Sequence, residues 1–266
     1  MDLQDILYEK PTPSIALATF HRPKKLNAFR NQTFQELLSI LDDFEQDSSS
    51  RVLILTGSGR AFSSGADLSE VKQQLEAAMD TDQYRKNLEV MQQLTRRIVN
   101  LDKPVIAAMN GLAMGVGIEV GMACDIRVCS ESTYISFSEA KRALFQTNGS
   151  IYILPKLVGL GRAMEMFMTG RKVAAKELLS IGFVTAVFPD DQFANKTMDL
   201  AIEISKNAPL SLKLLKRLSW RSGELSLEEV MEKEVEGMLE CYKSTDMKEA
   251  MSAFAEKREP IFNKDY

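Results

Sequence analysis

The alternation of apolar and polar positions along the chain predicts strands that alternate with helices. Short aliphatic runs closed by turns are typical of buried strands, and they occur at Ser14–Phe20, Arg51–Gly57 and Lys103–Gly111. Apolar residues three and four positions apart predict a helix over Phe34–Phe44. A longer charged helix is expected from about Leu68 to Asn100, with a break near Met79–Asp82.

The second half of the chain has a mostly helical pattern. Residues 125–140 predict a strand or a hairpin, and Phe183–Phe188 is expected to be extended. From about Ala208 to Lys257, Leu and Met alternate with Glu and Lys, as in amphipathic helices that pack on the body or on another subunit. Because strands alternate with helices, we expect an α/β protein.

Composition narrows the possible functions. The 266 residues are 45% apolar and carry a net charge of −4, which argues against nucleic acid as a partner. Three cysteines without CxxC spacing indicate a reducing compartment, and a single histidine, His21, leaves no zinc site. No secretory signal or stretch of about 20 apolar residues is present, so we expect a cytoplasmic protein with no membrane partner.

Two loops have the same form, in which a strand is followed by glycine, small residues and a helix. Helix starts carry unpaired N–H groups and a partial positive charge, and glycine lets a substrate come close to the backbone. Two such N–H groups could hold a carbonyl oxygen as it becomes an enolate. The alternative is a pair of tight turns that pack helices on strands. The residues concerned are Ser64, Gly65, Ala66 and Asp67 in the first loop, and Gly115, Val116 and Gly117 in the second.

Glu119 is an acid within an otherwise small and apolar segment. If a helix begins near Val116, Glu119 follows three residues later on the same face. Its neighbours indicate burial, and a buried glutamate is costly unless it has a partner or a task. The alternative is an acid that caps the helix start or pairs with its dipole. For a second acid, Glu139, the pattern alone favours a solvated position at a helix start.

Four ordered segments that cover nearly the whole chain resemble the crotonase superfamily, the enoyl-CoA hydratase/isomerase family. They read HRPKKLNAF, GRAFSSGADLSE, KPVIAAMNGLAMGVGIEVGMACDIRV and MTGRKVAAKELLSIGFV. The resemblance implies a spiral of ββα turns with a C-terminal helical trimerisation region. We therefore expect a core with the thioester site over residues 1–200 and a helical oligomerisation region over residues 201–266.

The resemblance also implies a ligand and the roles of individual residues. The ligand would be an acyl-CoA thioester with no separate cofactor, and the assembly a homotrimer or a homohexamer. Ala66 and Val116 match the oxyanion-hole positions, and Glu119 and Glu139 match the catalytic pair. The substrate-binding positions implied by the resemblance are Lys24, Lys25, Ala28, Ser64, Asp67, Leu68, Ser69, Gly115, Phe254 and Lys257, the last two reaching the CoA of a neighbouring subunit. For these two, a solvated helix end with one core aromatic is the alternative.

Retention of both glutamates points to syn addition of water to a trans-2-enoyl-CoA. By the resemblance, Glu119 would accept a proton from water and Glu139 would protonate the α-carbon. One segment departs from the family: P-G-x-G-G after the second glutamate is replaced here by Gln146–Ser150, in which only Gly149 matches. Isomerisation of a 3-enoyl-CoA, hydration with retro-aldol cleavage of an aromatic or branched acyl group, and a non-catalytic CoA-ester binder therefore remain alternatives.

Overall fold

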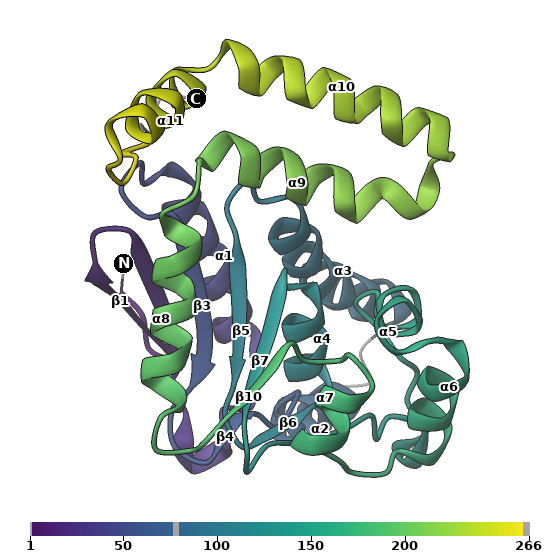
Figure 1. Ribbon diagram of the computed structural model, residues 1–266. Helices are drawn as coiled ribbons and strands as arrows, with labels where there is room; N and C mark the ends of the chain where they lie inside the picture. The colour runs from purple at the N-terminus through teal and green to yellow at the C-terminus, as the bar shows by residue number, and fades with distance from the viewer. Residues whose placement is uncertain (1, 77–79, 263–266) are drawn as a thin grey trace.

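Two β-sheets form the centre of the protein in the computed structural model, which describes residues 2–76 and 80–262 (Figure 1). The larger sheet has the order β1-β2-β3-β5-β7-β10, and the smaller one has the order β4-β6-β8-β9. The strands are β1 (Ile6–Thr12), β2 (Ile15–Phe20), β3 (Val52–Gly57), β4 (Ala61–Ser63), β5 (Val105–Met109), β6 (Leu112–Met114), β7 (Ile126–Ser130), β8 (Tyr134–Ser136), β9 (Val173–Ala174) and β10 (Ala186–Phe188).

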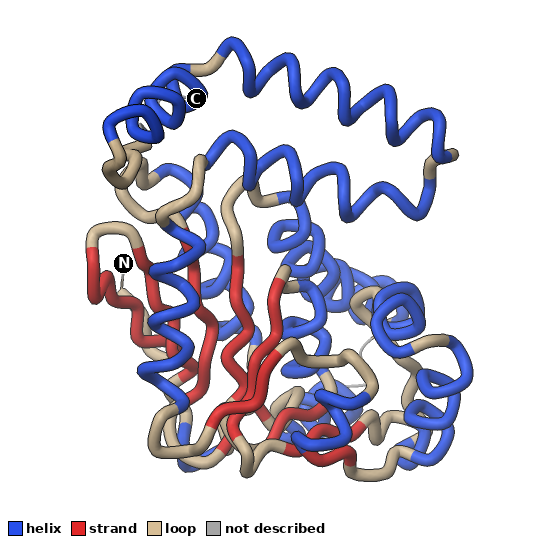
Figure 2. Tube along the Cα trace, in the orientation of Figure 1, coloured by secondary structure: helices blue, strands red, loops and turns tan. Residues whose placement is uncertain are grey.

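Helices surround the two sheets, as Figure 2 shows in blue. The α-helices are α1 (Asn31–Gln46), α2 (Leu68–Glu76), α3 (Thr81–Asn100), α4 (Val116–Ala123), α5 (Ser150–Val158), α6 (Leu160–Thr169), α7 (Ala175–Ser180), α8 (Phe193–Ser205), α9 (Pro209–Arg221), α10 (Leu227–Lys243) and α11 (Thr245–Glu256). Three short 3-10 helices are η1 (Pro23–Lys25), η2 (Ala140–Arg142) and η3 (Ser222–Glu224).

The chain enters the two sheets in turn. β3, β5 and β7 lie in the larger sheet, and the strand that follows each of them, β4, β6 or β8, lies in the smaller one. Neighbouring strands pair in parallel both from β3 to β7 and from β4 to β8. Each repeat therefore advances by two strands and a helical segment, which confirms the expected α/β spiral of ββα turns.

Most of the expected elements are confirmed, and two differ. The hairpin considered for residues 125–140 is wrong, because β7 and β8 lie in different sheets and do not pair with each other. β1 was not expected; its Pro11 is tolerated because β1 is an edge strand that pairs with β2 alone. The expected long helix consists of α2 and α3, and Asp80 caps the start of α3. Met79 lies outside the described residues.

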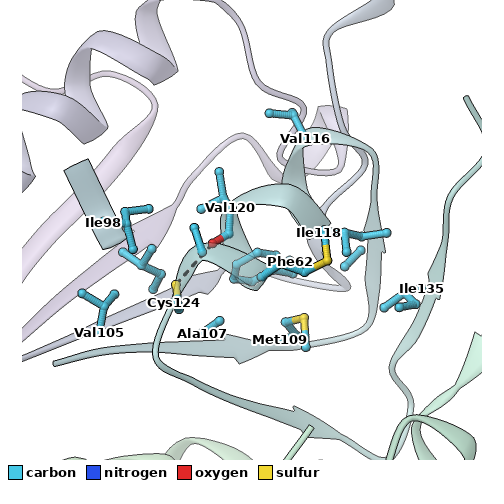
Figure 3. Close-up of a cluster of buried hydrophobic side chains, with 14 of the residues drawn as sticks. Phe62, Ile98, Val105, Ala107, Met109, Val116, Ile118, Val120, Cys124 and Ile135 are labelled. Atoms are coloured by element: carbon cyan, nitrogen blue, oxygen red, sulfur yellow. Dashed lines mark hydrogen bonds between the residues drawn. The ribbon is translucent and has the colours of Figure 1, made fainter. Parts of the chain in front are cut away.

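α4 is buried along its whole length. All eight residues from Val116 to Ala123 are buried, as expected for a helix that is apolar all round. Figure 3 shows its side chains among Phe62 of β4 and Met109 of β5. A Cβ on Gly117 would lie 2.6 Å from the Ser63 Cβ, so only glycine allows this close packing against β4. The start of α4 is therefore fixed against the smaller sheet.

α9 is joined to the core through a buried lysine. The side chain of Lys216 is 4% exposed and forms an ion pair with Asp125 Oδ2 at 2.8 Å. The same ammonium group donates to the Lys103 carbonyl at 3.0 Å, and Trp220 Nε1 donates to Asp125 Oδ1 at 3.1 Å. These contacts hold α9 on the turn between α4 and β7.

The C-terminal helices α9, α10 and α11 lie at the opposite end of the molecule from β4 and β6 (Figure 1). α10 has a row of exposed apolar side chains at spacings of three and four residues. They are Leu227, Met231, Val235, Met238 and Tyr242. The amphipathic character expected for this region is thus present. The boundary at residue 200 stays a prediction and falls within α8.

Candidate active site

Gly65 and Gly115 bring the two glycine-containing loops into contact. Their φ angles are +95° and +49°, a region that L side chains rarely adopt. A Cβ on Gly65 would lie 3.5 Å from the Gly115 Cα and 3.2 Å from the Met114 carbonyl oxygen. A side chain at Gly65 would be strained by this φ and would crowd the Met114 carbonyl oxygen. The residues that follow, Ala66 and Val116, are therefore held near one another.

The N–H groups of Ala66 and Val116 are available to a ligand. Val116 is the first residue of α4, and its N-cap, Gly115, has no side chain to bind the helix start. Among the hydrogen bonds of residues 2–76 and 80–262, none uses the N–H of Ala66 or of Val116. Unpaired N–H groups at a helix start attract negative charge. Both N–H groups are thus unused within the described residues, and their role as an oxyanion hole stays a prediction.

Glu119 is 2% exposed, which confirms the expected burial. Its partners come from the segment that precedes and begins α5. Oε1 accepts hydrogen bonds from the Thr147 N–H at 3.2 Å, the Thr147 hydroxyl at 3.0 Å and the Ser150 hydroxyl at 3.2 Å. Oε2 accepts from Asn148 Nδ2 at 2.5 Å. The buried carboxylate is therefore surrounded by hydrogen-bond donors.

Glu139 lies just before η2 and is half-buried. Its Oε1 is 3.3 Å from the position that a Cβ on Gly115 would occupy, so the carboxylate lies against the second loop. Its Oε2 accepts a hydrogen bond from Gln146 Nε2 at 2.9 Å. The structure thus places Glu139 beside the start of α4, close to Glu119, whereas the pattern alone favoured a solvated acid.

Opposing effects act on the pKa of Glu119. Burial is the largest and raises the pKa, while hydrogen bonds from Asn148 and Thr147 lower it. The charge of nearby Glu139 raises it further, and the net pKa of Glu119 is above its ordinary value. Such opposing influences within one pair of carboxyl groups are typical of sites that move protons.

Asp67 anchors the first loop. It accepts hydrogen bonds from the Ser69 N–H and hydroxyl and from Arg22 Nη2, the last at 2.8 Å. Burial would raise its pKa, but these hydrogen bonds and the charge of Arg22 lower the pKa of Asp67 to about 2. Arg22 also lies 3.6 Å from Asp5 Oδ1. Asp67 is therefore ionised at neutral pH.

A comparison with protein families shows to which family the chain belongs. The model of the enoyl-CoA hydratase/isomerase family matches residues 11–265. The chain belongs to this family. It is 36% identical over 259 residues to the short-chain-enoyl-CoA hydratase of Clostridium acetobutylicum, covering 97% of each chain. It is 30% identical to the mitochondrial Δ(3,5)-Δ(2,4)-dienoyl-CoA isomerase of Dictyostelium discoideum, covering 91% of this chain and 85% of that one.

Solved structures of the enoyl-CoA hydratase/isomerase family share the fold. The crystal structure of an enoyl-CoA hydratase from Bacillus anthracis superimposes with a TM-score of 0.92 at 32% identity. The match covers 98% of this chain and 100% of that one. The crotonase fold expected from the sequence is thus confirmed over nearly the whole chain, including the C-terminal helices.

The positions that the sequence predicts for CoA binding lie on the first loop and on the segment beside it. The Ser64 N–H donates to the Leu26 carbonyl at 2.9 Å, so the segment with Lys24, Lys25 and Ala28 runs beside the loop. Lys24 and Lys25 are exposed, and Ala28 is buried. Leu68 and Ser69, at the start of α2, are also exposed. This region therefore presents cations and polar groups near Ala66.

Phe254 and Lys257 lie apart from the other family positions. Phe254 is on α11 and is 82% exposed, and Lys257 follows the end of that helix. Figure 1 shows α11 at the opposite end of the molecule from β4 and β6. Within one chain, these two residues are therefore not brought to the glutamates.

Gln146, Thr147, Asn148 and Ser150 are the site residues that the sequence analysis missed. The departure from the family's P-G-x-G-G segment leaves the substrate and the reaction open but does not by itself reveal contacts with the glutamates. The signal that could have found them is the polarity of the segment, since Gln146, Thr147 and Ser150 stand where the family has proline and glycines, and Asn148 adds a fourth hydrogen-bonding side chain. In the structure, they bind Glu119 or Glu139.

Two further observations concern the described part of the chain. Residues 2–76 and 80–262 contain no group of three or more His, Cys, Asp or Glu side chains arranged to hold a metal ion. Over the same residues, no helix has both the length and the apolar character needed to cross a membrane.

Proposed function

We propose that the protein is an enoyl-CoA hydratase that adds water across the double bond of a trans-2-enoyl-CoA. One observation carries this proposal: Glu139 lies against the loop that begins α4, and Glu119 lies one turn into the same helix. Two carboxyl groups beside two free N–H groups supply a base, an acid and a site for a negative oxygen.

In the proposed reaction, the N–H groups of Ala66 and Val116 bind the thioester carbonyl oxygen. Glu119 takes a proton from water as the water oxygen bonds to the β-carbon, and the electron pair of the double bond moves to form an enolate. Glu139, as the general acid, then delivers a proton to the α-carbon, which restores the carbonyl group. Removing one oxyanion donor costs about 3–4 kcal/mol in comparable enzymes, so the two N–H groups account for a large part of the rate.

The loop of Asp67 and the segment of η1 would bind the CoA part of the substrate. The exposed ammonium groups of Lys24 and Lys25 supply charges for phosphate groups, and buried Ala28 follows in the same segment. Ser64, Leu68, Ser69 and Gly115 would border the pantetheine arm and the thioester. No separate cofactor is required, because coenzyme A is part of the substrate.

The exposed apolar row on α10 supports assembly into a trimer or a hexamer. A contiguous apolar face of this kind marks an interaction surface. In such an assembly, Phe254 and Lys257 would reach the CoA of a neighbouring subunit. Within their own chain they lie far from the glutamates. The cytoplasmic location stays a prediction.

The direct test follows the absorbance of the conjugated enoyl thioester, which falls as water adds. Glu119→Gln and Glu139→Gln should each lower kcat by about 10²- to 10⁴-fold, the usual range for loss of a general acid or base. Asp199→Asn, an exposed acid on α8, is the matched control and should leave the rate unchanged. Near-wild-type rates in both glutamate variants would contradict the mechanism.

Other outcomes of the same assay identify the alternatives. A rise in absorbance with a 3-enoyl-CoA, without a 3-hydroxyacyl product by mass spectrometry, would indicate an isomerase. Release of an aldehyde from an aromatic or branched substrate would indicate hydration followed by retro-aldol cleavage. Calorimetric binding without turnover over a broad acyl panel would indicate a non-catalytic binder.

A further inference from the structure

The segment Gln146–Ser150 contacts both glutamates of the site. Thr147, Asn148 and Ser150 direct four donor groups at Glu119, and Gln146 directs one at Glu139. An ionised carboxylate has about four acceptor positions, so Glu119 is nearly saturated. Donors aimed at a carboxylate favour its charged form. One short segment therefore supplies hydrogen-bond donors to both Glu119 and Glu139.

The side-chain amides of Gln146 and Asn148 are oriented so that their nitrogens donate to the glutamates. Asn148 Oδ1 and Gln146 Oε1 are buried and have no hydrogen-bond partner among the described residues, while both amide nitrogens bind carboxylates. A flip of either amide would place its oxygen against a carboxylate oxygen. The amide orientations are therefore fixed by Glu119 and Glu139, at the expense of two buried acceptors left without partners.

Few other charges affect Glu119. The strands packed against α4, which are β4, β5 and β6, contain no titratable residue. On α3, Arg96 binds Gln92, and Arg97 binds Asp42 and Glu45. On α5, Lys156 lies over the Tyr152 ring. Among the main influences on the pKa of Glu119, the charge comes from Glu139, and the neutral donors of Thr147 and Asn148 oppose its effect.

We propose that Thr147, Asn148 and Ser150 are positioning residues that keep Glu119 ionised as the base, while Gln146 fixes the carboxyl group of Glu139 beside Gly115. This inference rests on the proposed hydratase function. The polar segment thus gives the two acids different surroundings, although their charges would repel each other if both were ionised. The polar residues that replace the glycine-rich family segment then have a role in the site, because they position its two glutamates.

Asn148→Gly is a suitable test because the φ angle of Asn148 is +51°, which glycine adopts without strain. The variant removes the amide that donates to Glu119 and leaves the backbone free to keep its shape. We expect the acidic midpoint of the kcat/KM profile, which reports the free enzyme, to rise by about one pH unit. Ala143→Gly is the matched control: its φ is +55°, it is exposed, and its profile should equal that of the wild type.

Thr147 provides a second, independent pair of variants. Thr147→Val removes the hydroxyl donor at nearly constant volume and should move the acidic midpoint upward, in the same direction as Asn148→Gly. Thr147→Ser keeps the hydroxyl and should restore the wild-type profile. A merely structural role would change the stability of Thr147→Val without moving the midpoint. Thermal unfolding of each variant provides that comparison.

Titration of the Glu119 carboxyl carbon by NMR separates this inference from the proposed function. The resonance is assigned with Glu119→Gln, and its midpoint in the substrate-free protein should rise in Asn148→Gly and Thr147→Val but not in Ala143→Gly or Thr147→Ser. If these shifts occur in a protein without hydratase activity, the proposed function fails and the positioning role stands. If the wild type hydrates enoyl-CoA and neither midpoint moves in either variant, the positioning role is overturned.

Discussion

Glu139 Oε1 lies 3.3 Å from the position that a Cβ on Gly115 would occupy. The acid proposed to protonate the α-carbon therefore lies directly against the residue that precedes the Val116 N–H donor. A side chain at Gly115 would act on both groups at once, because it would push away the carboxylate and disturb the start of α4.

Gly115→Ala should therefore lower activity far more than stability. The φ/ψ pair of +49°/−130° lies outside the left-handed helical region and costs a residue with a Cβ about 1–3 kcal/mol, and displacement of the Val116 N–H would remove the proposed oxyanion stabilisation. We expect kcat to fall about 100-fold with little change in KM, as measured by steady-state hydration kinetics. Gly161→Ala is the control, since a Cβ there meets no atom within 4 Å. Equal kinetics in both variants would contradict the assigned role of Gly115.

Asp67 should make stability depend on pH. Its folded pKa of about 2 lies below its ordinary value of 3.8, so ionised Asp67 stabilises the fold above pH 4, and this stabilisation is lost as the pH falls toward 2. We expect wild type to lose about 1–2 kcal/mol relative to Asp67→Asn over this interval. Urea unfolding of both proteins from pH 6 to pH 2 measures the difference, and a difference independent of pH would refute the prediction.

Lys216→Met should destabilise the protein because it leaves Asp125 without its cation. Removing one partner of a buried pair costs about 3–5 kcal/mol, and the partial exposure of Asp125 reduces this to about 2–3 kcal/mol. Urea unfolding checks the value. The control is Lys213→Met, whose 3.2 Å pair with Asp102 is more exposed and should cost less than about 1 kcal/mol. Similar losses in both variants would mean that burial of the pair is unimportant.

Charges on the apolar row of α10 should dissociate the expected assembly. Met231 and Val235 are both exposed and lie one turn apart, so Met231→Glu/Val235→Glu would bury two acids in an interface formed by this face. Light scattering after gel filtration should show a trimer or a hexamer for wild type and a smaller species for the variant. KM for the thioester should rise in the variant, because Phe254 and Lys257 would no longer reach a neighbour. A wild-type monomer would contradict the proposed assembly.

The sequence pattern predicted the elements well where runs of aliphatic residues coincide with buried strands and glycines mark the turns. The apolar strands at 52–57 and 105–109 and the start of α4 at Val116 followed directly from aliphatic runs and glycine placement. The strand β1 was missed, because Pro11 and the charged residues Glu9 and Lys10 are poor strand signals. An edge strand tolerates them, but edge position is a property of the whole sheet.

The candidate site was predictable only in part. Glu119 was expected to be buried because its neighbours are small, and the structure confirms this. Its partners, Thr147 and Asn148, lie 28 and 29 residues further along the chain. No periodicity connects such positions, since they meet only after the chain has passed through β7 and β8. Asp67 was expected near the thioester, but its bond to Arg22 depends on tertiary packing in the same way.

The network Asp5–Arg22–Asp67 has a consequence for changes made far from the substrate. Asp5 is buried, forms a 2.8 Å ion pair with Arg30 and lies 3.6 Å from Arg22, which in turn holds the loop of Ala66 through Asp67. A truncation or fusion that disturbs the segment before β1 would weaken these contacts among Asp5, Arg22 and Asp67. Its effect would then reach the backbone of Ala66, which we propose binds the thioester carbonyl, although no truncated atom touches the ligand. Changes in the N-terminal segment are therefore expected to lower catalytic efficiency from a distance.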